Sequence, residues 1–257
     1  IERSLCHDDL LWITSRGPGI NYYTFSDNKI HSLQHPMLRI INEIYEENDS
    51  VLWLASSIYG VVRLSMEKNG EQLSIKSCRN YVFKRGEYLC SEVYSFVPDG
   101  MGSLYVGCRG GLGVAKFDLK TSEYSFLLSD VSAMGDVICM LQLNDSVMFY
   151  GASSGMGRIK LNNLGSLITT YDHSKGMRND MVHSMLAEED GNVWLATNKG
   201  LTKFMVRTQE FHNFQNYNSE IVEFCDNASH RCIYTGRLLF GGINGVLWVD
   251  PNTSDAN

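Results

Sequence analysis

One pattern recurs along the chain at intervals of about 45 residues, and it constrains the fold more than any other feature. Its clearest copy is EEDGNVWLATNKGLTKF, from Glu188 to Phe204: an acidic turn, a short apolar run around a tryptophan, small residues, a glycine and a second short run. Similar stretches begin at Asp8, Asn48, Asp99, Asn144 and Thr235. A repeat of this length is typical of propeller blades.

A large apolar residue occupies the tryptophan position of every copy. The six positions are Trp12, Trp53, Tyr105, Phe149, Trp194 and Leu239, with spacings of 41, 52, 44, 45 and 45 residues. A stripe of such residues is more often packing than a sugar-binding platform. We therefore expect these side chains to fill the space between neighbouring blades.

Each unit contains about four short apolar or β-branched runs separated by turns, without the 3.6-residue period of an amphipathic helix. Asp190 and Gly191 are expected in the turn between the first two strands. A glycine is expected in each turn between the second and third strands: Gly60, Gly111, Gly155, Gly200 and Gly245. The pattern predicts an all-β fold, a propeller of four-stranded antiparallel blades over residues 1–251. It has six units, the last without its outer strand, and a polar tail at 252–257.

Charge and hydropathy exclude several classes of function. The net charge of −7 argues against a nucleic-acid partner, which requires a basic surface. No apolar stretch approaches the roughly 20 residues that cross a bilayer, and the first residues do not resemble a signal peptide. The chain begins in mid-pattern without a methionine, so we expect it to be a piece of a larger protein.

The seven cysteines have no metal-ligand spacing and no C-x-x-C pair. We expect most of them to be small buried apolar residues. A disulfide between Cys225 and Cys232 is an alternative if the compartment is oxidising.

Signals of catalysis are weak. GCRGGLG, from Gly107 to Gly113, does not lead into a helix, so a turn between strands is favoured over a phosphate-binding loop. The carboxylates of EIYEENDS and LAEEDG fall in the turns of the repeat, where solvation is a sufficient explanation. We expect no catalytic residues, no metal and no cofactor, and therefore no enzyme activity in this domain.

The clearest copy resembles the two-component regulator propeller repeat, found in extracytoplasmic sensor regions of hybrid two-component systems. The preceding YDHSKGMRNDMVHSML is similar to the family's lead-in to a blade. The end of the chain is similar to the last blade of such sensors, with Glu223–Phe224, the FGG at Phe240–Gly242 and the closing Pro251. The fifth and sixth units match well, the first two fairly, and the third and fourth loosely.

The resemblance implies a non-catalytic periplasmic sensor domain. In that family the propellers are seven-bladed, bind oligosaccharides, and signal as dimers through a membrane helix to a histidine kinase that controls glycan-utilisation genes. It therefore implies an oligosaccharide ligand, a second protomer of a homodimer, and membrane attachment only through the full-length protein. The six units would be part of a seven-bladed propeller, a closed ring of six being the alternative.

A propeller generally meets its ligand at the loops that join second to third strands and successive blades. Arginine, tyrosine and asparagine can hydrogen-bond sugar hydroxyls there, and a set of Arg and Lys side chains suits an acidic sugar. The candidate ligand-binding residues are Arg16, Tyr59, Arg109, Ser154, Arg178, Lys199 and Asn244, with Asn179 and Asp180 beside them. Two other functions stay open, because fold does not determine function: a propeller-fold bacterial lyase-like enzyme, or a protein-interaction scaffold.

Overall fold

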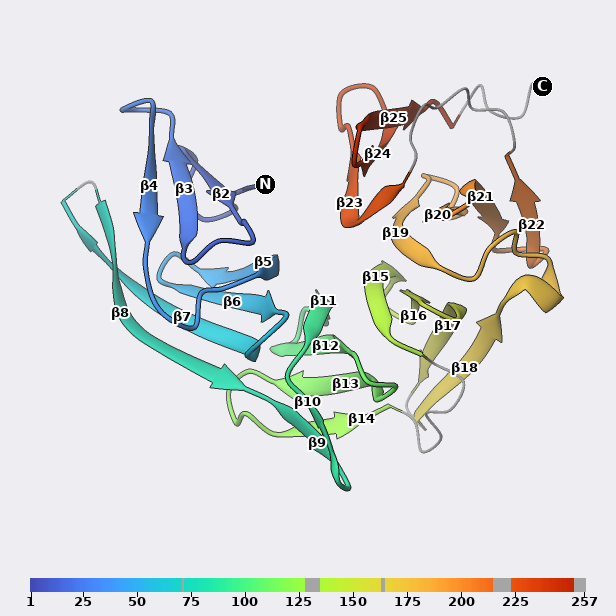
Figure 1. Ribbon diagram of the computed structural model, residues 1–257, viewed down its shortest axis with the longest axis horizontal. Coiled ribbons are helices and arrows are strands. Elements are labelled where there is room, and N and C mark those ends of the chain that lie inside the picture. The colour runs from blue at the N-terminus through green and yellow to red at the C-terminus, as the bar shows by residue number, and fades with distance from the viewer. Residues whose placement is uncertain (71, 128–134, 163–164, 215–222, 252–257) are drawn as a thin grey trace. The chain divides into compact units, whose positions relative to one another are not determined.

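The computed structural model describes residues 1–70, 72–127, 135–162, 165–214 and 223–251. The polar tail predicted at 252–257 lies outside these residues. The chain divides into two compact units, Ile1–Gly110 with Ala115–Ser125, and Gly111–Val114 with Phe126–Asn257. Each unit is described by itself below, with Figure 1 labelling the strands.

The first unit contains three four-stranded sheets, each with its strands in chain order. The first sheet is β1 (Glu2–Arg3), β2 (Leu10–Ile13), β3 (Ile20–Thr24) and β4 (Lys29–Leu33). The second is β5 (Ile41–Asn48), β6 (Val51–Ser56), β7 (Gly60–Asn69) and β8 (Gln72–Tyr81). The third is β11 (Val93–Pro98), β12 (Ser103–Cys108), β13 (Gly113–Asp118) and β14 (Tyr124–Phe126), and the division between the units falls within it.

The second unit contains two further four-stranded sheets and one three-stranded sheet. The fourth sheet is β15 (Val137–Asn144), β16 (Val147–Ala152), β17 (Gly155–Asn162) and β18 (Gly165–Tyr171). The fifth is β19 (Val182–Ala187), β20 (Val193–Thr197), β21 (Gly200–Met205) and β22 (Glu210–Asn213). The sixth is β23 (Phe224–Arg231), β24 (Leu238–Gly242) and β25 (Gly245–Val249). A single 3₁₀ turn, η1 (His173–Lys175), is the one helical element among the described residues.

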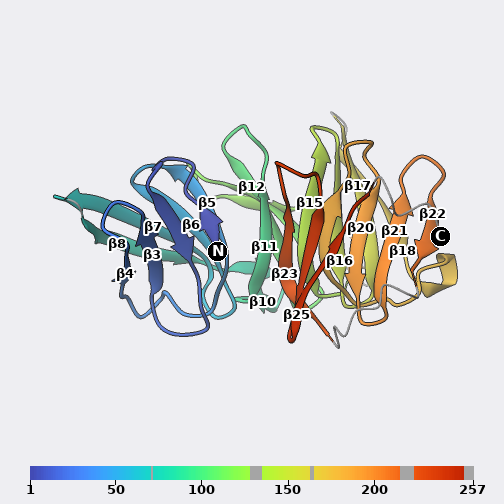
Figure 2. The same cartoon turned by 90° about the horizontal axis from the view of Figure 1, so that it is seen from above.

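The predicted all-β fold with six blade-like sheets is confirmed, and the last sheet has three strands in the described part of the chain, as expected. A seventh blade is not seen among these residues, so a seven-bladed ring stays a prediction. Within the second unit the first strands β15, β19 and β23 contact one another in succession, and the sheets lie side by side (Figure 2). This is the arrangement of propeller blades, with the first strand of each innermost.

The sequence spacing of 52 residues between Trp53 and Tyr105 has a structural cause that the repeat pattern did not predict. Strands β7 and β8 are each ten residues long, and an extra two-stranded hairpin follows them. The hairpin consists of β9 (Phe83–Arg85) and β10 (Tyr88–Cys90). Phe83 anchors it to the third sheet, because its ring is fully buried 5.8 Å from that of Phe117. The longer spacing is therefore an insertion between two blades.

The residues at the tryptophan position pack between sheets, which confirms the prediction for five of the six. Trp12, Trp53, Tyr105, Phe149 and Trp194 are all at most 5% exposed, whereas Leu239 is only partly buried. Within the first unit the Trp53 ring lies 5.6 Å from Phe117 of the next sheet. Burial of such side chains is the dominant stabilising contribution in a stack of sheets.

The prediction that the repeat's acidic residues are solvated is wrong for Glu188. Its side chain is only 6% exposed, accepts a hydrogen bond from the indole N–H of Trp194, and lies 3.1 Å from the ammonium of buried Lys203. Lys203 faces Trp194 across the ladder between β20 and β21. A buried carboxylate needs such partners, so here the acidic residue belongs to the packing of the blade.

Candidate functional site

Of the glycines predicted in the turns between second and third strands, Gly111 lies in its turn and the other four directly follow theirs, as the first residue of the third strand. The backbone has positive φ at Gly60, Gly111, Gly155, Gly200 and Gly245. In each unit the starts of neighbouring first strands approach one another: Asn42 of β5 reaches Val93 of β11, and His183 of β19 reaches Asp226 of β23. Neighbouring sheets therefore run in the same direction, and within each unit these turns lie at one end of the sheets, here called the loop end.

The structure places all seven predicted ligand-binding residues at the loop end of their own unit. Six lie between second and third strands, and Arg178 lies in the connection from β18 to β19. The first unit carries Arg16, Tyr59 and Arg109; the second carries Ser154, Arg178, Lys199 and Asn244. That these residues bind a ligand stays a prediction.

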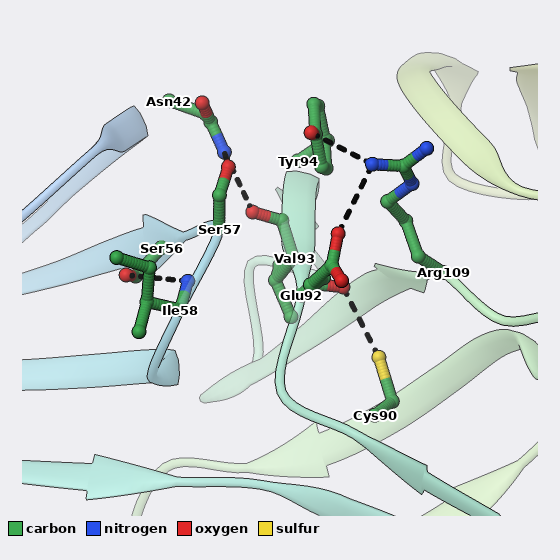
Figure 3. A network of polar contacts seen from close by, with 9 residues as sticks. All are labelled: Asn42, Ser56, Ser57, Ile58, Cys90, Glu92, Val93, Tyr94 and Arg109. Atoms are coloured by element: carbon green, nitrogen blue, oxygen red, sulfur yellow. Dashed lines mark hydrogen bonds and ion pairs between the residues drawn. The ribbon is translucent and has the colours of Figure 1, made fainter. Parts of the chain in front are cut away.

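Arg109 has two partners that the sequence did not indicate (Figure 3). Its Nη1 atom donates to the Glu92 carboxylate at 3.0 Å and to the Tyr94 hydroxyl at 2.9 Å. Its guanidinium carbon also lies 4.8 Å from the centre of the Tyr94 ring. The side chains of Arg109 and Glu92 remain 36% and 50% exposed. The three residues form a polar group with donors and acceptors open to solvent, in which the arginine charge is balanced by Glu92.

Asn42 extends this polar surface toward the second sheet (Figure 3). Its amide nitrogen donates to the Ser57 hydroxyl at 2.8 Å and to the Val93 carbonyl at 2.9 Å. Because Val93 directly precedes Tyr94, Asn42 holds the start of β11 beside the loop between β6 and β7. The two sheets therefore present one continuous polar strip, formed by Asn42, Ser57, Tyr94, Glu92 and Arg109.

The other two predicted residues of the first unit contribute less to this strip. Arg16 is exposed in the loop between β2 and β3. Tyr59 is half-buried, and its side chain packs against the hydrophobic core between the first two sheets. Its carbonyl accepts a hydrogen bond from Asn80 at 3.2 Å. Tyr59 therefore supports the loop as much as it is available to a ligand.

In the second unit His183 is a buried polar side chain at the loop end, only 4% exposed. One ring nitrogen, Nδ1, lies 2.7 Å from the Asp226 carboxylate, and Nε2 lies 2.6 Å from the side-chain oxygen of Asn198. The hydrogen bond to Asp226 raises the pKa of His183 above its usual range. Two acceptors around one imidazole fit the doubly protonated ring.

The four predicted ligand-binding residues of the second unit differ in their exposure and contacts. Ser154, Lys199 and Asn244 are exposed in their loops. Arg178 is half-buried, and its guanidinium donates to the Phe214 carbonyl at 3.4 Å. Beside it, Asp180 accepts hydrogen bonds from the backbone N–H and the ring of His173, each at 2.6 Å. Asp180 therefore closes its own loop.

Asn42, Tyr94 and His183 share a structural position that sequence reasoning missed. In β5, β11 and β19 the register with the second strand shifts after the first residue pair, so each of the three residues is the extra residue of a β-bulge. Bulges redirect a side chain and are common beside functional sites. The signal was present as Val-Tyr-Ser at 93–95 and Val-His-Ser at 182–184, but no strand register could be read from it.

The described residues contain no group of three or more His, Cys, Asp or Glu side chains that could hold a metal ion. Over the same residues, no helix has the length and apolar character needed to span a membrane. The loop ends offer hydroxyl, amide, guanidinium and carboxylate groups, which suit recognition of a polar ligand by hydrogen bonds.

No protein-family model matches the chain. A curated protein, histidine kinase P4 of Formosa agariphila, is 24% identical over 266 aligned residues, which cover 97% of this chain and 19% of that protein. Two extracellular domains from Bacteroides thetaiotaomicron, assigned to hybrid two-component systems, have TM-scores of 0.71 and 0.72 at 18% and 17% identity. They align with 98% and 95% of this chain and 33% of their own length.

The chain resembles the sensor regions of hybrid two-component systems, as its repeats predict. It spans about a fifth of the curated histidine kinase and a third of each of the two extracellular domains. An inactive variant of virginiamycin B lyase from Staphylococcus aureus is also similar, with a TM-score of 0.72 and 13% identity over 96% of this chain and 80% of the lyase. These structural similarities establish the β-propeller fold.

Proposed function

We propose that this chain is part of a periplasmic, non-catalytic sensor domain of a hybrid two-component system. The observation that carries the proposal is the similarity over nearly the whole chain to two extracellular domains of such systems and to a histidine kinase. In the proposed arrangement the propeller binds its ligand outside the cytoplasm. The full-length protein, acting as a homodimer, passes the signal to a histidine kinase that controls glycan-utilisation genes.

The proposed ligand is an oligosaccharide bound at the loop end. The polar strip of the first unit supports this proposal, because Arg109, Glu92 and Tyr94 offer donors and acceptors around one solvent-exposed position. Neighbouring hydroxyls of a sugar ring both donate and accept, and Tyr94 adds an aromatic ring. Since Glu92 already balances the Arg109 charge, the strip suits neutral hydroxyls, whereas exposed Lys199 in the second unit suits an acidic group.

An enzyme of the lyase type is the second candidate, and the similarity to virginiamycin B lyase is the observation that favours it. It differs from the sensor proposal in one measurable respect: a sensor returns its ligand unchanged. A scaffold propeller would bind a protein and no oligosaccharide.

Titration calorimetry of the complete ectodomain against plant, host and microbial oligosaccharides, with chromatography of the recovered sugar, separates the three. The sensor proposal expects a dissociation constant in the micromolar range, about −8 kcal/mol, because sugars exchange hydrogen bonds with water for those with protein. Cleaved sugar would indicate an enzyme, and no heat with any sugar would favour the scaffold.

Replacing Arg109 tests where the ligand lies. We expect Arg109→Ala to weaken binding at least about tenfold, the loss of one or two charge-assisted hydrogen bonds. The matched control is Lys29→Ala, which removes an exposed cation at the first residue of β4, at the opposite end of its sheet. Equal affinity of the two variants would place the ligand away from the polar strip.

A further inference from the structure

Two buried thiols lie directly beneath the Arg109–Glu92 pair. Cys90 ends strand β10 and is 2% exposed, and Cys108 ends strand β12 and is fully buried. The Glu92 carbonyl accepts a hydrogen bond from the backbone N–H of Arg109, directly after Cys108, at 3.2 Å. The interaction between the two thiols lowers the pKa of Cys90 and raises that of Cys108. The Cys90 sulfur also lies 3.1 Å from the Glu92 carbonyl (Figure 3).

The two cysteines come from different structural elements. Cys90 belongs to the inserted hairpin β9–β10, whereas Cys108 lies on the third sheet, where it pairs with Val93 at the start of β11. The Glu92 carbonyl contacts both the Cys90 sulfur and the backbone next to Cys108, which brings the two residues to the short range that a disulfide requires. From this juxtaposition we propose that Cys90 and Cys108 form a disulfide in the mature protein, joining the inserted hairpin to the third blade.

The compartment favours the bond. Disulfides persist in secreted, periplasmic and extracellular domains, and the proposed function places this domain outside the cytoplasm, so the presence of the bond in cells rests on that proposal. The chemistry itself is tested on the purified protein and depends on no ligand.

The reaction needs a disulfide as oxidant, which we take to be a thiol–disulfide exchange partner such as oxidised glutathione. The hydrogen bond from Cys108 lowers the pKa of Cys90, so Cys90 is the thiol that ionises first. Its thiolate attacks one sulfur of the oxidant, and the first thiol leaves. Cys108, after losing its proton, attacks the Cys90 sulfur of the mixed disulfide and releases the second thiol. Two electrons and two protons pass from the protein to the oxidant.

The bond would fix the base of the polar strip. Glu92 lies two residues beyond Cys90, and Arg109 directly follows Cys108, so the disulfide holds the two chain segments that carry this ion pair. Because both thiols are buried, exchange in the folded protein is slow. We expect the bond to form during folding, before the hairpin packs on Phe117.

The sequence makes the test direct. Trypsin cleaves after Arg85 and next after Arg109, because no Lys or Arg lies between them. Trypsin therefore releases both cysteines in one peptide. Protein refolded in reduced and oxidised glutathione is unfolded, alkylated without reduction and digested. We expect the 86–109 peptide without alkyl groups and about 2 Da lighter than its reduced form, through the loss of two hydrogens. Two alkyl groups on this peptide after oxidative refolding would overturn the proposal.

Stability supplies the second readout. A cross-link between residues 90 and 108 restricts the unfolded chain, so the oxidised protein should melt about 6–12 °C higher than the reduced protein. The shift should vanish in Cys90→Ala and in Cys108→Ala. It should persist in Cys139→Ala, the matched control at a buried cysteine of β15. A shift that Cys90→Ala retains would also contradict the proposal, whereas absence of sugar binding would leave it standing.

Discussion

The indole of Trp194 donates its N–H to the carboxylate of Glu188, and both side chains are buried at the start of the fifth blade's second strand. The same hydrogen bond recurs between Trp53 and Glu47 at 2.7 Å, although the Glu47 side chain is exposed. Each tryptophan thus fills the space between blades with its ring and ties the turn between the first two strands with its nitrogen. The repeat's acidic turn and its tryptophan form one structural unit.

Trp194→Ala should therefore destabilise the protein by about 3–5 kcal/mol, the usual cost of removing a large buried aromatic side chain. Trp194→Phe keeps most of the ring and should cost less. Urea denaturation measures both. A Trp194→Ala variant that unfolds like the wild type but no longer binds sugar would show that the residue is a ligand platform.

The buried pair of Glu188 and Lys203 should be much more sensitive to loss of one partner than of both. Either Glu188→Ala or Lys203→Ala removes one member of a buried ion pair, which costs about 3–5 kcal/mol. The double variant Glu188→Gln with Lys203→Met removes both charges and should be closer to the wild type than either single alanine variant. In the double variant Glu188→Ala with Lys203→Ala, a loss in free energy of unfolding equal to the sum of the two single losses would contradict this coupling.

His183 should make the stability of the protein depend on pH. Its folded-state pKa is raised by Asp226, so its stabilising contribution is complete below about pH 6.5, the pKa of histidine in an unfolded chain, and is lost as pH rises through the folded-state pKa. His183→Asn, which places at this bulge the residue found at Asn42, should lack this dependence.

We therefore expect the difference in free energy of unfolding between the wild type and His183→Asn to shrink from pH 6 toward higher pH. Asp226→Asn should abolish the same pH dependence, because it removes the carboxylate that holds the proton. Parallel pH profiles for the wild type and both variants would rule out this role for the histidine.

Gly60 at the start of β7 and Gly86 in the turn of the inserted hairpin β9–β10 form a matched pair. Both have positive φ, +75° and +59°, but a Cβ at Gly60 would lie 2.2 Å from the Tyr81 carbonyl, whereas a Cβ at Gly86 would meet nothing within 4 Å. Gly86→Ala should cost about 1–2 kcal/mol from backbone strain alone. Gly60→Ala should cost about 1–3 kcal/mol more, and thermal melts of equal midpoint would contradict this account.

The blade repeat could be predicted because it depends on local chemistry. The strands alternate with turns that need glycine, and residues such as Trp194 fill space in any blade. The candidate site was only partly predictable. The loop positions of Arg109 and Lys199 follow from the repeat, but the partners of Arg109 and His183 depend on strand register. Glu92 reaches Arg109 across 17 residues, and Asp226 reaches His183 across 43.

The acidic residues illustrate the same limit. Glu188 occupies a position that composition alone assigns to solvent, and its burial depends on Lys203, 15 residues later on β21. Its partner is itself a residue that is usually exposed. Neither burial could be predicted without the other, because only the pair satisfies both charges.

A residue in a regular strand has to pair with the neighbouring strand and also follow the alternation of side chains between the two faces of the sheet. The bulge at the start of β5, β11 and β19 frees one residue from both requirements. The residues on either side of the bulge keep the ladder bonded, so Asn42, Tyr94 and His183 are released from the alternation that dictates every other position of these strands. Amide, phenol and imidazole occupy equivalent places on one scaffold. Evolution can thus exchange the chemistry at these places blade by blade, and a lineage of such propellers can acquire new ligands without redesigning its architecture.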